Sequence, residues 1–221
     1  MTARTVLRLL AAAALAAFLS TCAWPLAGER GRLNRMVRET VFVKSRWTQG
    51  SGVLVGPRIV ITAMHLFKSP ITSVQITFSD GTTISGERVV AARKIDIAVI
   101  RLDKPKRGVF ATVVCRSLVL DDPVIAVGNP VWMRWFVTHG TRGSLKKAEG
   151  IDYPHVLLSL KTLPGSSGGP IFDRLGRLRG IVKAGLRYRG IPITGYTIAT
   201  PASAFCAVPD VRKHISRVVG T

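Results

Sequence analysis

The chain has 221 residues, and its 32 Lys and Arg against 12 Asp and Glu give a formal net charge of +20. This length suits one compact module or two small ones, and the charge attracts anions, so lipid headgroups or polysaccharide are candidate surface partners. The basic residues are scattered, without zinc-ligand spacing, an RNP-like aromatic pattern or a basic groove-binding helix, so we expect a solvated basic surface and no specific nucleic-acid partner.

The first 28 residues are predicted to be an export segment. A positive start ending at Arg8 precedes the apolar run Leu9–Leu19, which has the length of a signal-peptide core. Three outcomes stay open: cleavage after Ala23, lipidation of Cys22 in a lipobox-like stretch, or retention as an anchor, because no charge follows Arg8 before Glu29. We therefore expect an exported protein that is periplasmic or membrane-tethered.

Beyond this segment, short runs of Val, Ile and Thr alternate with turns, in a chain with 21 Gly and 12 Pro. This pattern predicts an all-β protein, and the alternation over Val74–Phe78 is typical of a half-buried strand. Only Asp210–Val218 is predicted to be a helix, at the C-terminal surface. His139 and His155 lie in different segments without paired ligand spacing, so no metal site and no cofactor is predicted.

Two segments place a histidine and an acid at the ends of apolar strands. Gly50–Val55 is a hairpin partner for Ile59–Ala63, a strand that leads directly to His65. Farther along, Asp96 opens the apolar strand Ile97–Ile100. Either residue alone would be an ordinary structural feature, so a catalytic role for the pair requires a nucleophile elsewhere in the chain.

The third segment is Gly165-Ser166-Ser167-Gly168-Gly169-Pro170. A serine hydroxyl is a weak nucleophile, so it needs a base and donors for the developing oxyanion. The glycines let the chain turn so that the amides of Gly165 and Ser167 face one point. The order His65, Asp96, Ser167 therefore predicts nucleophilic catalysis. Gly-x-Ser-x-Gly also matches the elbow of α/β-hydrolases, with Asp210 and His214 following, but Pro170 disfavours the helix that an elbow requires.

With these segments in order, the sequence resembles the trypsin-like serine peptidases, specifically their bacterial HtrA/Deg-type branch, over Val37–Ala207. The matching stretches are GSGVLV with VITAMHLF, DIAVIRL, AVGNP with FVTHG, GSSGGP, GRLRGIV and GYTIA. The resemblance implies two antiparallel six-stranded β-barrels of the chymotrypsin type, over 37–117 and 118–205, with a short C-terminal helix or tail over 206–221. No PDZ module is expected, because the chain ends at Thr221.

The resemblance also implies roles for individual residues. His65, Asp96 and Ser167 would form the catalytic triad of an endopeptidase working through an acyl-enzyme, with the amides of Gly165 and Ser167 as the oxyanion hole. Lys183, Ala184 and Gly185 would pair with the backbone of a peptide or protein substrate. The alternative is a catalytically silent module that binds peptides or anions, which the unusual stretch Leu160–Pro164 favours.

The primary specificity pocket is implied by the same resemblance. Lys161 would lie at its base, and Gly185 and Gly195 would keep its walls open. Because an unpaired buried charge is costly, such a pocket should reject Arg and Lys, and accept small apolar residues or acidic ones. Ser166 replaces the aspartate that pairs with a newly cut N-terminus in many relatives, so we expect no activation of that kind.

Cysteine usage bears on the compartment. Cys22 lies in the export segment, which leaves Cys115 and Cys206 as a candidate disulfide in an oxidising environment. Two buried free thiols are the alternative, and the sequence leaves both open.

Overall fold

The computed structural model describes residues 28–67, 72–131, 133–143, 155–215 and 218–219. Contacts divide the chain into two units, Met1–Arg35 and Met36–Thr221. The predicted export segment and Cys22 lie outside the described residues. Among the residues that are described, no helix has the length and apolar character needed to span a bilayer.

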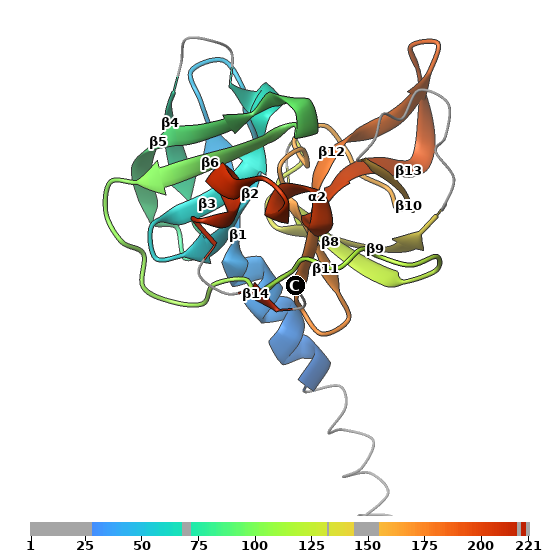
Figure 1. Cartoon of the computed structure of the whole chain (residues 1–221), viewed down its shortest axis with the longest axis horizontal. Coiled ribbons are helices and arrows are strands. Elements are labelled where there is room, and N and C mark those ends of the chain that lie inside the picture. Colours follow the sequence, from blue (N-terminus) through green and yellow to red (C-terminus); the bar gives the residue numbers. More distant parts are fainter. Residues whose placement is uncertain (1–27, 68–71, 132, 144–154, 216–217, 220–221) are drawn as a thin grey trace, which may run out of the picture. The chain divides into compact units, whose positions relative to one another are not determined.

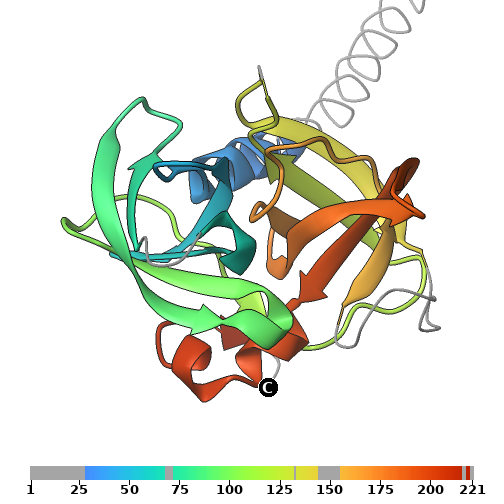
Figure 2. The same ribbon diagram turned by 90° about the horizontal axis from the view of Figure 1, so that it is seen from above.

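The first half of the larger unit is a closed six-stranded barrel (Figures 1 and 2). Around the ring the strands follow the order β1, β2, β3, β6, β5, β4, and every pairing is antiparallel. They comprise β1 (Thr40–Lys44), β2 (Gln49–Gly56), β3 (Ile59–Ala63), β4 (Ser73–Thr77), β5 (Thr83–Ala92) and β6 (Ile97–Leu102). The predicted alternation is confirmed in β4, where Val74 and Ile76 are buried in the barrel core between exposed neighbours.

The second half forms another antiparallel ring, in the order β11, β8, β9, β10, β13, β12, which a β11–β12 pairing closes. It consists of β8 (Pro123–Gly128), β9 (Phe136–Arg142), β10 (Val156–Ser159), β11 (Pro170–Asp173), β12 (Leu178–Tyr188) and β13 (Ile191–Pro201). Leu158, Ile171 and Val182 belong to its buried core. The fold class is therefore as the sequence predicted: two barrels side by side, drawn blue to green and yellow to orange in Figure 1.

The C-terminal region differs from the single helix expected over Asp210–Val218. It has two short helices, α2 (Ala202–Cys206) and α3 (Pro209–Arg212), and then a strand, β14 (Val218–Val219). Pro209 has no N–H to continue a helical ladder, so it ends the first helix and begins the second. β14 pairs in parallel with β7 (Val113–Val114), which also joins β12 at the border of the second barrel.

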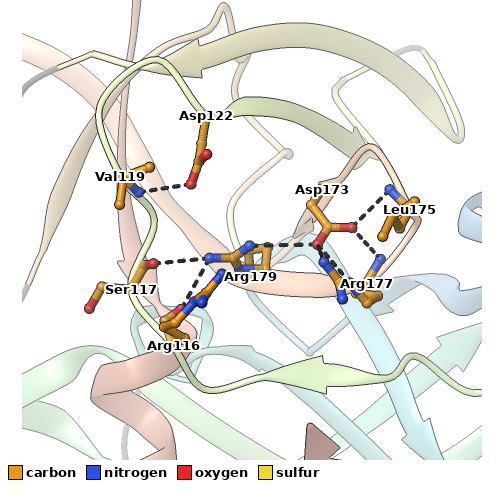
Figure 3. A network of polar contacts seen from close by, with 8 residues as sticks. All are labelled: Arg116, Ser117, Val119, Asp122, Asp173, Leu175, Arg177 and Arg179. Carbon is orange, nitrogen blue, oxygen red and sulfur yellow. Dashed lines mark hydrogen bonds and ion pairs between the residues drawn. The ribbon is translucent and has the colours of Figure 1, made fainter. Parts of the chain in front are cut away.

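A disulfide and a buried ion pair hold the segment between the barrels. Cys115 is bonded to Cys206 at the end of α2, with a Cα–Cα distance of 5.8 Å. Directly after it, the carbonyls of Arg116 and Ser117 accept hydrogen bonds of 3.2 and 3.0 Å from Arg179 of β12 (Figure 3). The Arg179 guanidinium also lies 3.5 Å from the carboxylate of Asp173 in β11.

The burial of two arginines corrects part of the prediction that the basic residues form a solvated surface. Arg93, Arg101 and Arg187 are indeed exposed. Arg142 and Arg179, in contrast, are buried within the second barrel. Burial disfavours the charged form of Arg142 and so lowers the pKa of its guanidinium. These two arginines belong to the packing of the barrel and not to the surface that attracts anions.

Candidate active site

His65 lies in a one-turn 3₁₀ helix, η1 (Met64–Leu66), immediately after β3. Met64 and Leu66 on either side are buried in the core of the first barrel. The histidine side chain between them remains 45% exposed. The alternation of buried and exposed residues at this strand end thus fixes the backbone and leaves the imidazole accessible.

Asp96 follows a second 3₁₀ turn, η2 (Arg93–Ile95), and has a left-handed backbone with φ 56° and ψ 42°. Aspartate tolerates this region better than most residues, because its short polar side chain bonds locally. Asp96 Oδ2 lies 2.8 Å from His65 Nδ1, and Oδ1 accepts the backbone N–H of His65 at 2.9 Å. An ionised carboxylate only accepts hydrogen bonds, so this contact requires a proton on Nδ1; in the neutral imidazole Nε2 then presents a lone pair.

Ser167 follows a tight turn, in a stretch whose conformation was not predicted from the sequence. Ser166 N–H donates to Leu163 O at 2.9 Å across Pro164 and Gly165, whose φ is +97°. Proline at the second position and a glycine with positive φ at the third are typical of a type II turn. The unusual stretch before the nucleophile therefore supplies suitable turn residues. Within the described part of the chain, the amides of Gly165 and Ser167 have no hydrogen-bond acceptor.

The turn places Ser167 against the strand that leads to His65. Ser51 N–H of β2 donates to Ser167 O at 2.8 Å. A Cβ on Gly168 would lie 2.2 Å from Thr62 Oγ1 and 3.0 Å from the amide nitrogen of Ala63, in β3. The Ser167 hydroxyl itself donates to the carbonyl of Lys183 at 3.0 Å. The structure thus joins His65 to Asp96 directly and Ser167 to both barrels, with the hydroxyl turned toward β12.

The predicted substrate edge, Lys183–Gly185, belongs to β12. The pairing of β12 with β11 ends at Ile181, while its other edge pairs with β13 through Ala184 and Gly185. From Lys183 onward, the edge away from β13 has no partner among the described strands. A Cβ on Gly185 would meet no atom within 4 Å, and the same holds for Gly195, whose φ is +86°. The role of this edge in binding substrate stays a prediction.

The cavity that Lys161 borders is not lined by either of those two glycines. The side chain of Lys161 is exposed, and the cavity, of about 110 Å³, is lined mainly by β8, β9 and the stretch before Ser167. The lining residues are Ala126, Val127, Gly128, Phe136, Thr138, Lys161, Thr162, Leu163, Ser166 and Val182. The stretch is tied to β13 by the contact of 2.9 Å between the hydroxyls of Thr162 and Thr197.

The alternative elbow arrangement is absent from the described residues. β11, and not a helix, follows Ser167. The Asp210 carboxylate bonds to Lys213 at 2.7 Å on the surface, and this contact lowers the pKa of the carboxyl. Two residues near the site were missed by sequence reasoning: Ser51 and Asn129 are polar, buried and bonded to each other. The sequence feature that could have identified them is a polar residue inside an apolar strand, as Ser51 is, or directly after one, as Asn129 is.

Comparison with known families decides the relationship. The family model described as "Trypsin-like peptidase domain" matches residues 50–181. The chain belongs to this family. Proteins similar to it include the "Probable periplasmic serine endoprotease DegP-like" of Brucella suis, 30% identical over 73% of this chain, and the "Peroxisomal leader peptide-processing protease" of Mus musculus, 32% identical over 66%. These alignments cover 32% and 27% of the two relatives, so this chain spans about a third of their length or less.

A solved protease structure shares the fold. The structure described as "HtrA-type protease AlgW with decapeptide" superposes with a TM-score of 0.71, covers 84% of this chain and 68% of its own, and is 19% identical. Together with the DegP-like relatives, this neighbour confirms the predicted resemblance to the HtrA/Deg-type branch.

Proposed function

We propose that the protein is a serine endopeptidase that uses His65, Asp96 and Ser167. The observation that carries the proposal is the 2.8 Å contact between Asp96 Oδ2 and His65 Nδ1 beside the turn that presents Ser167. In the reaction, Ser167 Oγ attacks the peptide carbonyl and His65 Nε2 takes the hydroxyl proton. His65 then gives this proton to the leaving amine. Departure of the amine leaves an acyl-enzyme, which water hydrolyses.

The backbone around Ser167 supplies the remaining groups. The amides of Gly165 and Ser167, which have no acceptor among the described residues, would donate to the oxyanion of the tetrahedral intermediate. The open edge of β12 from Lys183 would pair with the substrate backbone as an added strand. Backbone pairing tolerates many side chains, so the proposed substrates are extended segments of proteins or peptides.

The hydroxyl of Ser167 must turn before it can react. The hydroxyl is bonded to the Lys183 carbonyl, and no contact among the described residues joins it to His65. Rotation about the Cα–Cβ bond replaces one hydrogen bond with another, a change that side chains make readily. The same observation is what favours the second candidate function, a silent module in which the serine stays bonded to β12 and peptides only bind.

A covalent fluorophosphonate probe separates the two candidates. In an enzyme, Ser167 Oγ attacks phosphorus, fluoride leaves and His65 takes the proton, because only an activated serine reacts readily. We expect mass spectrometry to find the probe on Ser167, and no labelling of Ser167→Ala. Ser203→Ala, at a partly buried position of α2, is the matched control and should label like the unmodified protein. An unlabelled native protein would support the silent module.

For specificity, we propose that the enzyme does not cleave after Arg or Lys. Lys161 adds positive charge to the stretch before the nucleophile, and the chain carries +20 overall, so a basic side chain entering this region meets repulsion. A positional-scanning peptide library is expected to show cleavage after small apolar or acidic residues. Gly185→Val has free space and should fold normally, yet reduce cleavage after large residues. Dominant cleavage after Arg or Lys would overturn the pocket assignment.

We also propose that the protein is exported and acts in the periplasm or tethered to a membrane. The Cys115–Cys206 bond supports this, because disulfides persist mainly in oxidising compartments. The charge of +20 would favour contact with anionic headgroups or polysaccharide. Cell fractionation tests the location, and recovery of active protein from the cytoplasm with both thiols reduced would contradict it.

A further inference from the structure

Two hydrogen bonds fix the peptide groups on either side of Gly165. The backbone N–H of Val131, in the loop after β8, donates to Pro164 O at 3.0 Å. The hydroxyl of Ser51, in β2 of the first barrel, donates to Gly165 O at 2.8 Å. The turn before Ser167 is therefore held from two directions by groups that lie far from it in the sequence.

Ser51 uses its full hydrogen-bonding capacity at this point. Besides donating to Gly165 O, its Oγ accepts the backbone N–H of Asn129 at 2.8 Å and lies 3.4 Å from the Asn129 side-chain nitrogen. Its own N–H donates to Ser167 O at 2.8 Å. Ser51 is fully buried, so water has little access to its hydroxyl. One side chain of the first barrel thus connects the turn and the loop after β8.

The Val131 bond acts on the peptide group that carries the Gly165 N–H, and the Ser51 bond to Gly165 O fixes the next peptide group, on the other side of the Gly165 Cα. In a planar trans peptide the C=O and N–H groups point in opposite directions, so holding Pro164 O toward Val131 directs the Gly165 N–H away from it. Space around the turn is also limited, because a Cβ on Gly165 would lie 2.6 Å from Asn129 O and 3.0 Å from Pro130 Cα. A glycine turn would otherwise exchange easily between orientations of this peptide.

We propose that Ser51 is a positioning residue for the oxyanion hole, acting together with the Val131 amide. It does not touch the substrate. It holds the Gly165–Ser166 peptide, while Val131 holds the Pro164–Gly165 peptide that carries the Gly165 N–H, so the two bonds together fix the backbone on both sides of Gly165 before the reaction begins. Preorganised donors are effective because they need no reorganisation when charge develops. This inference rests on the proposed function, since the oxyanion exists only if Ser167 attacks a carbonyl.

The test is Ser51→Ala. The measurement compares how strongly the variant stabilises the transition state with how strongly it binds the ground state. We expect kcat for a peptide substrate to fall about 10²-fold with little change in KM, the scale associated with losing one oxyanion donor. A peptide aldehyde, which forms an oxyanion on Ser167, should bind weaker by about the same factor. The corresponding peptide alcohol should bind as before. Ser51→Thr retains the hydroxyl and should restore the aldehyde affinity.

Thr40→Val is the matched control for loss of a buried hydroxyl. Thr40, in β1 of the same barrel, is also fully buried, and its Oγ1 donates to Met36 O at 2.8 Å. This variant should lose thermal stability without changing the ratio of aldehyde to alcohol affinity. If Ser51→Ala does not fold, Val131→Pro removes the other bond while Val131→Ala keeps it, and only the proline variant should lose aldehyde affinity.

The outcomes separate this inference from the proposed function. An unmodified protein that neither hydrolyses peptides nor binds the aldehyde would refute the endopeptidase itself. An active native enzyme whose Ser51→Ala variant keeps kcat, or loses aldehyde and alcohol affinity equally, would refute only the positioning role of Ser51.

Discussion

Asp96→Asn is expected to lower the turnover of peptide hydrolysis about 10⁴-fold, and Ser167→Ala to abolish it. Asparagine can donate from its amide to His65 Nδ1, which would put the imidazole proton on Nε2 and remove the base. The backbone bond from His65 to Oδ1 can persist, and asparagine tolerates the left-handed φ of 56° at this position. The variant should therefore stay folded while losing activity. Alanine would be a poorer choice, since it would add backbone strain.

The matched control for this substitution is Asp121→Asn. Asp121 is also an aspartate with positive φ, 59°, but it is exposed and lies outside the site. Turnover of this variant should equal that of the unmodified protein. Steady-state kinetics with one peptide substrate, together with circular dichroism of each variant, provide the measurement. Substantial hydrolysis by Ser167→Ala would show that another group is the nucleophile.

Removing the disulfide should cost about 4–5 kcal/mol of unfolding free energy. Cys115 and Cys206 are 91 residues apart, and a cross-link that closes a long loop restricts the unfolded chain most strongly. For a domain of this size we expect the double variant Cys115→Ser/Cys206→Ser to melt roughly 10–20 °C below the unmodified protein. The bond also lies next to the Arg179 contacts with Arg116 and Ser117, so its loss frees one end of that segment.

A reductant provides the control for this prediction. It should lower the melting temperature of the unmodified protein toward that of the double variant and leave the variant unchanged. Non-reducing mass spectrometry should give the native protein a mass about two units below the reduced form, from the loss of two hydrogens. Alkylation of both cysteines in the folded protein without prior reduction would contradict the bond.

The sequence alone predicted the all-β class and the order of the candidate site residues, but not the two short helices near the C-terminus. Alternation of apolar residues, as in Val74–Phe78, has a period of two that only a half-buried strand satisfies. His65 and Asp96 stand at the ends of apolar strands, and Ser167 stands among glycines; their order along the chain, together with the resemblance to trypsin-like peptidases, made them the candidate residues. The contact between His65 and Asp96 then results from the antiparallel pairing of β3 with β6, which joins Ala63 to Ile97.

Tertiary structure alone decided the contacts between distant segments. The bond from Ser51 to Gly165 spans 114 residues, and nothing in the local pattern of either segment indicates it. Whether Lys161 faces a pocket and whether Cys115 meets Cys206 likewise depend on how loops pack after both barrels have closed. Arg179 could not be distinguished from surface arginines by sequence, because its burial depends on Asp173 and two carbonyls arriving at the same place. Periodicity encodes which face of a strand is buried, whereas these contacts depend on the register and packing of elements that are distant in the chain.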